Sequence, residues 1–130
     1  MKKFLCIVLA VVLSLGMATT AWARLSYLDI GTYGLLITDG EALVEGSLYV
    51  NNTNSCGIKV VLKERADMTK SWKSIKTFSV KENDYSTDIS ETYASCKPGY
   101  FYKATFTFYA YDSSGRVLES ITEDTTIERA

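Results

Sequence analysis

Residues 100–111 read YFYKATFTFYAY, and this stretch decides the fold class. Aromatic and β-branched residues dominate it, and its side chains fall into two sets that alternate with a period of two. Strands have this period because successive side chains point to opposite faces of a sheet. Asp112 to Gly115 then supplies turn-forming residues. The stretch therefore predicts a long strand that ends in a hairpin turn.

Strand-like stretches with polar or turn-forming boundaries occupy most of the chain before and after this strand. Asp39-Gly40 favours a tight hairpin turn, and the polar run from Asn51 to Ser55 favours an exposed loop. An irregularity near Ser74 indicates a bulge. The expected strands cover residues 33–38, 42–50, 58–63, 72–80, 85–89, 100–111 and 117–127, and residues 24–32 fit either a short edge strand or a loose arm. About seven short strands predict an all-β fold, an antiparallel sandwich of two sheets.

The start of the chain has the pattern of a cleavable signal peptide. Lys2 and Lys3 supply positive charge, an apolar run extends from Phe4 to Leu13, and Ala21-Trp22-Ala23 gives the small-x-small pattern of a cleavage site. The run is shorter than the roughly 20 residues that span a bilayer. We therefore expect residues 1–23 to be removed and residues 24–130 to form one secreted domain, with no stable membrane anchor.

Composition excludes several classes of function. The sequence has 14 basic and 15 acidic side chains, and loss of Lys2 and Lys3 would leave 12 (14 minus 2) against 15, a net charge of −3. Nucleic acid is not expected as a partner, since its binding requires a basic surface. The chain has no histidine, which removes Ser-His-Asp and Cys-His catalysis and imidazole zinc sites. We expect no enzyme activity, no cofactor and no metal site.

Two cysteines remain after residue 23, Cys56 and Cys96. An even pair in an exported chain favours a disulfide, which would close a loop of about 40 residues and stabilise the fold by roughly 3 to 4 kcal/mol. Two unpaired thiols are the alternative. We expect the bond.

The segment from Cys96 to Tyr102, with Pro98-Gly99 before the tyrosine and alternating apolar residues after it, resembles the sixth strand of fibronectin type III domains. The resemblance implies an immunoglobulin-like sandwich in which Tyr102 is the corner tyrosine. Its ring would point inward, and its hydroxyl would bond a backbone group of the preceding loop. Cys96 replaces the leucine of that pattern, and Trp72 falls later than the family's core tryptophan.

This resemblance conflicts with the disulfide. In the fibronectin pattern the third and sixth strands are antiparallel neighbours, so the two cysteines would lie about 25 Å apart at opposite ends of the sandwich. A disulfide requires α-carbons within about 7 Å. Either the bond is absent or intermolecular, or the strand order differs. We keep the bond, because the compartment is broader support than a resemblance over one strand.

Residues 33–127 also resemble a family of small secreted proteins from Gram-positive anaerobes. The shared features are the Asp39-Gly40 turn, the strand from Ile58 to Leu62, Trp72, residues 99–103, and the hairpin from Asp112 to Ser120. The resemblance implies bacterial export and a sandwich fold. It implies no activity and no functional residue.

The remaining candidate is one face of the strand at residues 100–111. Phe101, Lys103, Tyr109 and Tyr111 fall on the side opposite the expected core, where they could form an aromatic platform for a cell-envelope glycan or an extracellular protein. Cross-strand packing is the alternative explanation of these rings. We therefore expect a secreted, non-enzymatic binding module. A small secreted antagonist, either a bacteriocin-like toxin or a protease inhibitor, is the second hypothesis.

Overall fold

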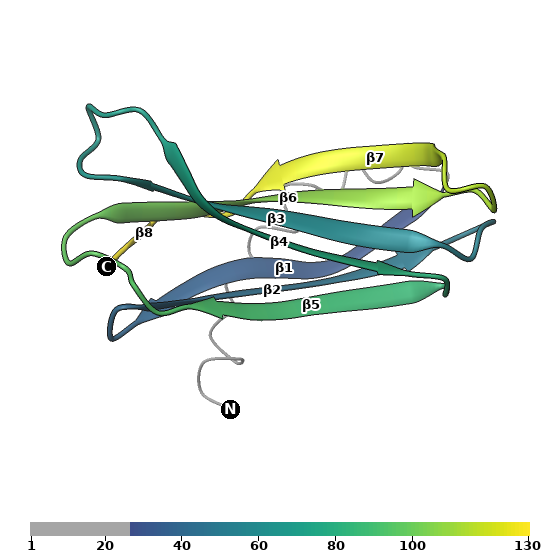
Figure 1. Ribbon diagram of the computed structural model, residues 1–130, viewed down its shortest axis with the longest axis horizontal. Coiled ribbons are helices and arrows are strands. Elements are labelled where there is room, and N and C mark those ends of the chain that lie inside the picture. The colour runs from purple at the N-terminus through teal and green to yellow at the C-terminus, as the bar shows by residue number, and fades with distance from the viewer. Residues whose placement is uncertain (1–26) are drawn as a thin grey trace.

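A computed structural model describes residues 27–130, and the predicted signal peptide at residues 1–23 lies outside them. This part of the chain is all β, which confirms the predicted fold class (Figure 1). None of its segments is a helix of the length and apolar character needed to cross a membrane. The strands are β1 (Leu28–Thr38), β2 (Glu41–Val50), β3 (Cys56–Arg65), β4 (Lys73–Glu82), β5 (Ser86–Tyr93), β6 (Phe101–Tyr111), β7 (Val117–Asp124) and β8 (Glu128–Arg129).

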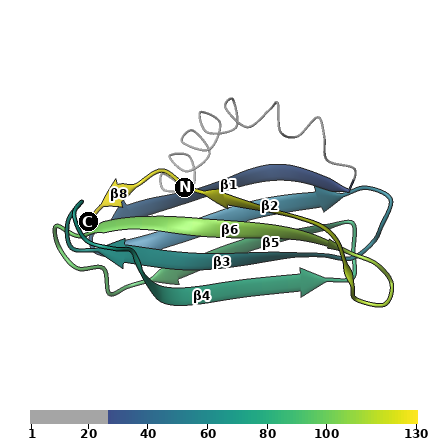
Figure 2. The ribbon, with the colours of Figure 1, turned by 90° about the horizontal axis from the view of Figure 1, so that it is seen from above.

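The strands form two antiparallel sheets that pack as a sandwich. Sheet A has the order β1-β2-β5, and sheet B has the order β4-β3-β6-β7, with the short β8 also paired to β6. Figures 1 and 2 show the strands of both sheets running along the long axis of the molecule. β3 and β6 are antiparallel neighbours, as the fibronectin pattern implies.

The inner sides of the two sheets form the core. On β6 every second residue is buried, from Tyr102 to Ala110. The ring of Tyr33 on β1 meets the rings of Phe106 and Phe108, with centroids 5.6 and 5.8 Å away. Gly46 on β2 permits this contact, because a β-carbon there would lie 2.7 Å from the Phe106 ring. The alternation read from residues 100–111 thus corresponds to one buried and one outward side.

Most predicted boundaries agree with the structure. Asp39 and Gly40 form the two-residue turn between β1 and β2 with φ values of 52° and 76°, which is the left-handed region that such turns require. A register shift between Leu62 and Lys63 lies opposite the expected bulge near Ser74. The open question at residues 24–32 is answered from Leu28 onward, where the chain is the edge strand β1. The strand predicted at residues 117–127 ends earlier, as β7 at Asp124, and the short β8 lies beyond the predicted range.

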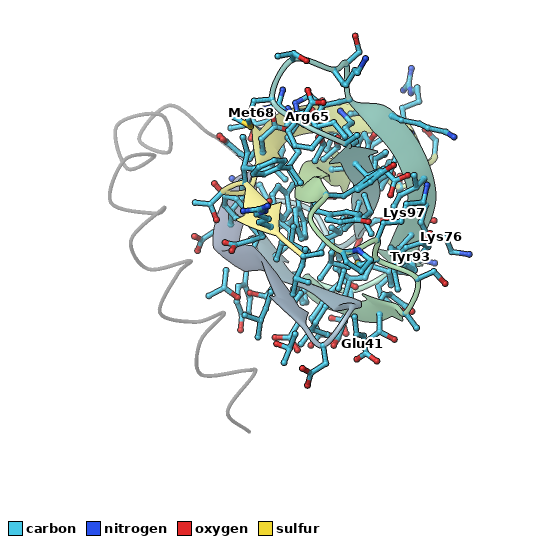
Figure 3. The ribbon with its side chains drawn as sticks, turned by 90° about the vertical axis from the view of Figure 1, so that its left-hand side faces the viewer. Glu41, Arg65, Met68, Lys76, Tyr93 and Lys97 are labelled. Atoms are coloured by element: carbon cyan, nitrogen blue, oxygen red, sulfur yellow. The ribbon has the colours of Figure 1, made fainter. Side chains whose placement is uncertain are left out.

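Tyr102 occupies the corner position that the resemblance implies. Its hydroxyl accepts a hydrogen bond from the backbone N–H of Lys97 at 2.7 Å and donates one to Oε2 of Glu64 at 3.0 Å. Lys97 Nζ lies 3.3 Å from Oε1 of the same carboxylate, which is only 7% exposed. Figure 3 shows the end of the sandwich that carries Lys97. These bonds join the β5–β6 loop to the end of β3.

The expected disulfide is absent from this structure. Cys56 and Cys96 are both free and buried. Cys56 pairs with Ala110 at one end of sheet B, whereas Cys96 lies in the loop before β6 and donates its backbone N–H to Gly40 in the β1–β2 turn. β6 has 11 residues and spans about 33 Å, which separates the two thiols far beyond bonding range. The fibronectin-like strand order therefore overrides the argument from compartment.

Candidate binding surface

Basic side chains gather on the outer side of sheet B. Residues paired across strands share a face, so Lys59, Lys63 and Arg65 of β3 lie beside outward residues of β4 and β6. Within residues 27–130 the acidic residue at these outward positions is Asp124, which pairs with Thr105. We call this surface the basic face and define it by Lys59, Lys63, Arg65, Lys81, Lys103 and Arg129.

One end of the basic face carries a tyrosine pair. The rings of Tyr109 and Tyr111 are stacked with centroids 5.7 Å apart, and Lys81 Nζ lies 4.2 Å from the centroid of Tyr111. Gly57 lies beneath Tyr111, because a β-carbon at Gly57 would be 3.1 Å from that ring. Burial, and secondarily the neighbouring Tyr109, raises the pKa of Tyr111. Lys59, Lys81 and the tyrosines line a shallow depression of about 340 Å³.

The other end of the basic face is centred on Trp72, which precedes β4. The guanidinium of Arg65 lies 4.2 Å from the Trp72 ring centroid, and Lys103 Nζ lies 4.9 Å from it. Lys103 also pairs with Asp124 at 3.2 Å. Burial opposes ionisation of Asp124, but hydrogen bonds from Thr105 and Lys103 outweigh it and keep the pKa of Asp124 below its usual value. The Asp124 carboxylate is therefore charged at neutral pH.

The four residues predicted as a binding face all point outward from β6, but they do not form one platform. Phe101, Lys103, Tyr109 and Tyr111 are each partly buried. Phe101 and Tyr111 stand at opposite ends of the strand, about 33 Å apart. Phe101 lies beneath Arg129 of β8, at 5.6 Å from the guanidinium to the ring centroid. The structure thus replaces the expected continuous surface with two aromatic clusters separated by threonines.

Four residues on this side of sheet B are not singled out by the sequence pattern. Trp72 begins the strand predicted at residues 72–80, Arg65 lies outside the predicted strands, and Lys81 and Arg129 lie just beyond the ends of two of them. A signal was present in the sequence, since no Lys or Arg occurs between Arg24 and Lys59. The basic residues are therefore confined to particular strands, which net charge alone does not reveal.

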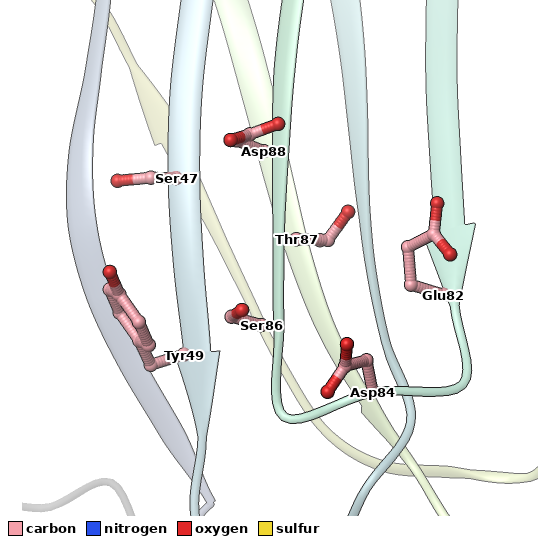
Figure 4. Close-up of a pocket in the computed structure, with 7 residues that line it drawn as sticks. All are labelled: Ser47, Tyr49, Glu82, Asp84, Ser86, Thr87 and Asp88. Carbon is pink, nitrogen blue, oxygen red and sulfur yellow. The ribbon is translucent and has the colours of Figure 1, made fainter.

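The outer side of sheet A has the opposite charge. Its three strands contain no Lys or Arg, and the outward positions include Asp29, Glu45 and Asp88. We call these three residues the acidic face. Beside it, Glu82, Asp84 and Asp88 line a recess of about 270 Å³ together with Tyr49 (Figure 4). Within residues 27–130 no group of three or more potential ligands is arranged to hold a metal ion.

Comparison with known proteins gives little further guidance. No family model matches the chain, and no curated protein matches it. Among solved structures, the chain is similar to OgpA from Akkermansia muciniphila, with 11% sequence identity and a TM-score of 0.47. The match covers 78% of this chain and 30% of OgpA, so the chain spans less than a third of that protein. This similarity is too weak to carry an argument about function.

Proposed function

We propose that this chain is a non-enzymatic binding module that acts outside the cell and holds its ligand on the basic face. The observation that carries the proposal is the gathering of six cationic side chains with Trp72, Phe101 and the tyrosine pair on the outer side of sheet B. Action outside the cell rests on the predicted signal peptide. A cell-envelope glycan or an extracellular protein is the expected partner.

The buried ionisable groups support a structural rather than a catalytic role. Each carboxylate oxygen of Glu64 accepts a bond, one from Tyr102 and one from Lys97. Burial raises the pKa of Tyr102, so this hydroxyl stays protonated and keeps donating. A carboxylate with both oxygens occupied is suited to fixing a loop. The absence of histidine from the sequence is consistent with this interpretation.

Retention on cell-envelope fractions tests the proposal. The purified chain is mixed with envelope fractions and with spent medium from its source, and the bound fraction is measured as a function of concentration. The double variant K59E/K63E reverses two charges on the basic face. The matched control K70E/K76E makes the same charge change at Lys70 in the β3–β4 loop and at Lys76, whose partner Leu62 places it on the inner side.

We expect saturable retention of the native chain and of K70E/K76E, with loss of retention in K59E/K63E. If both variants are retained as well as the native chain, the ligand binds outside the basic face. A native chain that stays unbound in every fraction would contradict the binding module and shift attention to the antagonist hypothesis.

A further inference from the structure

Three aromatic rings of the basic face, Trp72, Tyr111 and Phe101, lie close to cations, and Tyr109 stacks on Tyr111. Trp72 has both Arg65 and Lys103 within 5 Å of its ring centroid, and Tyr111 has Lys81 at 4.2 Å. Neutral sugars are bound by stacking on an open aromatic ring, and here the cations compete for that position. The rings instead hold flexible cationic groups in place, because cation–π attraction contributes about 0.5 to 2 kcal/mol. Fixed cations are suited to recognising negative charge.

We infer that the ligand of the basic face is an acidic polysaccharide, a linear sugar chain that carries carboxylate or sulfate groups. This inference rests on the proposed function and names its ligand class. The cations bind the acidic groups, and the rings set the positions of the cations.

The spacing of the cations fits an extended chain. Lys59, Lys63 and Arg65 lie on the outward side of β3, with Val61 between the first two, and span about 20 Å at roughly 3.3 Å per residue. Lys103 and Arg129 extend the surface toward Trp72 and Phe101. A small anion would contact one or two of these groups, whereas a linear polyanion reaches several at once. Binding several groups at once is what separates a polymer from its monomer in affinity.

The middle of the basic face is built for hydroxyl contacts. Between the aromatic clusters lie threonine side chains of β4, β6 and β7, and the hydroxyls of Thr107 and Thr122 are 3.1 Å apart. Hydroxyls donate and accept hydrogen bonds, as sugars do. A lipid surface or a typical protein partner requires projecting apolar side chains. Among residues 27–130 the exposed large hydrophobic residues are Tyr49, Met68, Tyr85, Val117, Leu118 and Ile127. Val117 stands at the margin of this face, and the Met68 sulfur lies 3.1 Å from Arg65 at its Trp72 end, so the face carries no continuous apolar patch.

The acidic face confines a polyanion to one side of the molecule. Asp29, Glu45 and Asp88 repel a negatively charged chain from sheet A, and no cation on that sheet offsets them. Local charge rather than net charge governs such an encounter. A chain whose net charge is −1, or −3 without residues 1–23, can therefore bind a polyanion in one orientation.

The test measures binding of the full chain to defined polymers. The acidic probes are polygalacturonate, which carries carboxylates, and heparin, which carries sulfates. Dextran is the neutral probe, galacturonic acid is the monomer, and single-stranded DNA is the polyanion without an acidic sugar chain. Each is titrated at about 50 mM and about 200 mM salt, the range in which binding to a polyanion weakens strongly.

We expect binding to at least one acidic polysaccharide, weaker on the order of tenfold at the higher salt. Dextran and galacturonic acid should not bind measurably. K59E/K63E should lose at least about tenfold in affinity, since each reversed charge turns an attraction into a repulsion. K70E/K76E should remain within about twofold of the native chain, and Trp72→Leu should lose a few-fold because Arg65 and Lys103 lose their support.

Four results would overturn the inference. Equal binding to dextran would show that the rings stack on neutral sugars. Tighter binding to DNA than to either acidic polysaccharide would show unspecific charge attraction. If K59E/K63E loses retention on envelope fractions while no acidic polysaccharide binds, the proposed function stands and the ligand class is wrong. If K59E/K63E keeps its retention on envelope fractions, both the proposed function and the inferred ligand class are wrong.

Discussion

The two outer faces of this sandwich are built by the same kind of strand and differ in charge. Sheet A presents Asp29, Glu45 and Asp88 on strands that contain no Lys or Arg. Sheet B presents lysines and arginines at the corresponding outward positions, two of them fixed over Trp72. The inner sides are alike, since both are apolar and buried. The difference between the sheets therefore concerns what the molecule contacts rather than how it folds.

One acidic residue of sheet B, Glu64, lies on the inner side of the sandwich. Glu64 of β3 is buried at the end of the core, where Tyr102 and Lys97 bind it. Glu45 of sheet A points outward and accepts a hydrogen bond from Ser90 at 3.2 Å in an exposed setting. Substituting these two glutamates separates the structural from the surface role of an acidic residue.

Glu64→Ala should lower the free energy of unfolding by about 2 to 3 kcal/mol. The substitution removes the acceptor of a buried hydroxyl, which costs about 1 to 3 kcal/mol, and leaves a small cavity. Lys97 is 56% exposed and can return to water, which limits the loss. Denaturant unfolding of the variant gives the value, with Glu45→Ala as control, expected to change stability by less than about 0.5 kcal/mol. Equal effects at both positions would contradict the assigned roles.

The sequence predicts the fold because alternation is strong where burial is strong. β6 has its even-numbered residues from Tyr102 to Ala110 inside, and the period of two in residues 100–111 is the direct record of that arrangement. The Asp39-Gly40 turn follows from local backbone preference. Tyr102 is predictable because the Pro98-Gly99 turn precedes it.

The candidate surface and the cysteine state depend on contacts that local sequence does not encode. Trp72 joins the basic face only because β3 and β6 are neighbours, which brings Arg65 and Lys103 to the same ring. The positions of Cys56 and Cys96 follow from strand order, and compartment carries no information about strand order. The fibronectin resemblance implies this strand order, so the disulfide prediction fails because it sets that order aside.

Reversing charges on the acidic face should reduce the difference in charge between the outer sides of the two sheets. The double variant E45K/D88K places two lysines on the outward side of sheet A, where both positions lie on neighbouring strands. We expect affinity for an acidic polysaccharide to rise by about three- to tenfold, because the repulsion is replaced by attraction. Titration calorimetry with polygalacturonate measures both affinity and the number of chains bound. The neutral variant E45Q/D88N is the control and should give a smaller rise, and an unchanged affinity in both would show that the acidic face does not act on the ligand.

Substituting the tyrosine pair measures how much these rings of the basic face contribute to the stability of the fold. Changing both Tyr109 and Tyr111 to Ser removes a stacked pair and the ring that lies over Gly57. We expect a loss of about 1 kcal/mol in the free energy of unfolding, or about 5 °C in Tm, since outward aromatic pairs contribute on this scale. Thermal unfolding measures it, and Tyr49→Ser on sheet A, at a 56% exposed ring, is the control that should change Tm by less. A larger change for Tyr49→Ser would contradict a packing role for the pair.

The smallest expected change in the free energy of unfolding concerns Asp124, the acidic residue that lies among the cations of the basic face. Its pKa is lower when folded, so the folded state holds the charged carboxylate more strongly than the unfolded state does. The resulting stabilisation is present at pH values above the ordinary pKa of an aspartate and is lost as the pH falls through the lowered value. Because the side chain is 49% exposed, solvent screening limits the contribution to a few tenths of a kcal/mol. Unfolding of Asp124→Asn and of the native chain from pH 7 to pH 3 should therefore show a gap that narrows with acid, and a gap that widens instead would mean that Lys103 and Thr105 do not stabilise the charged form.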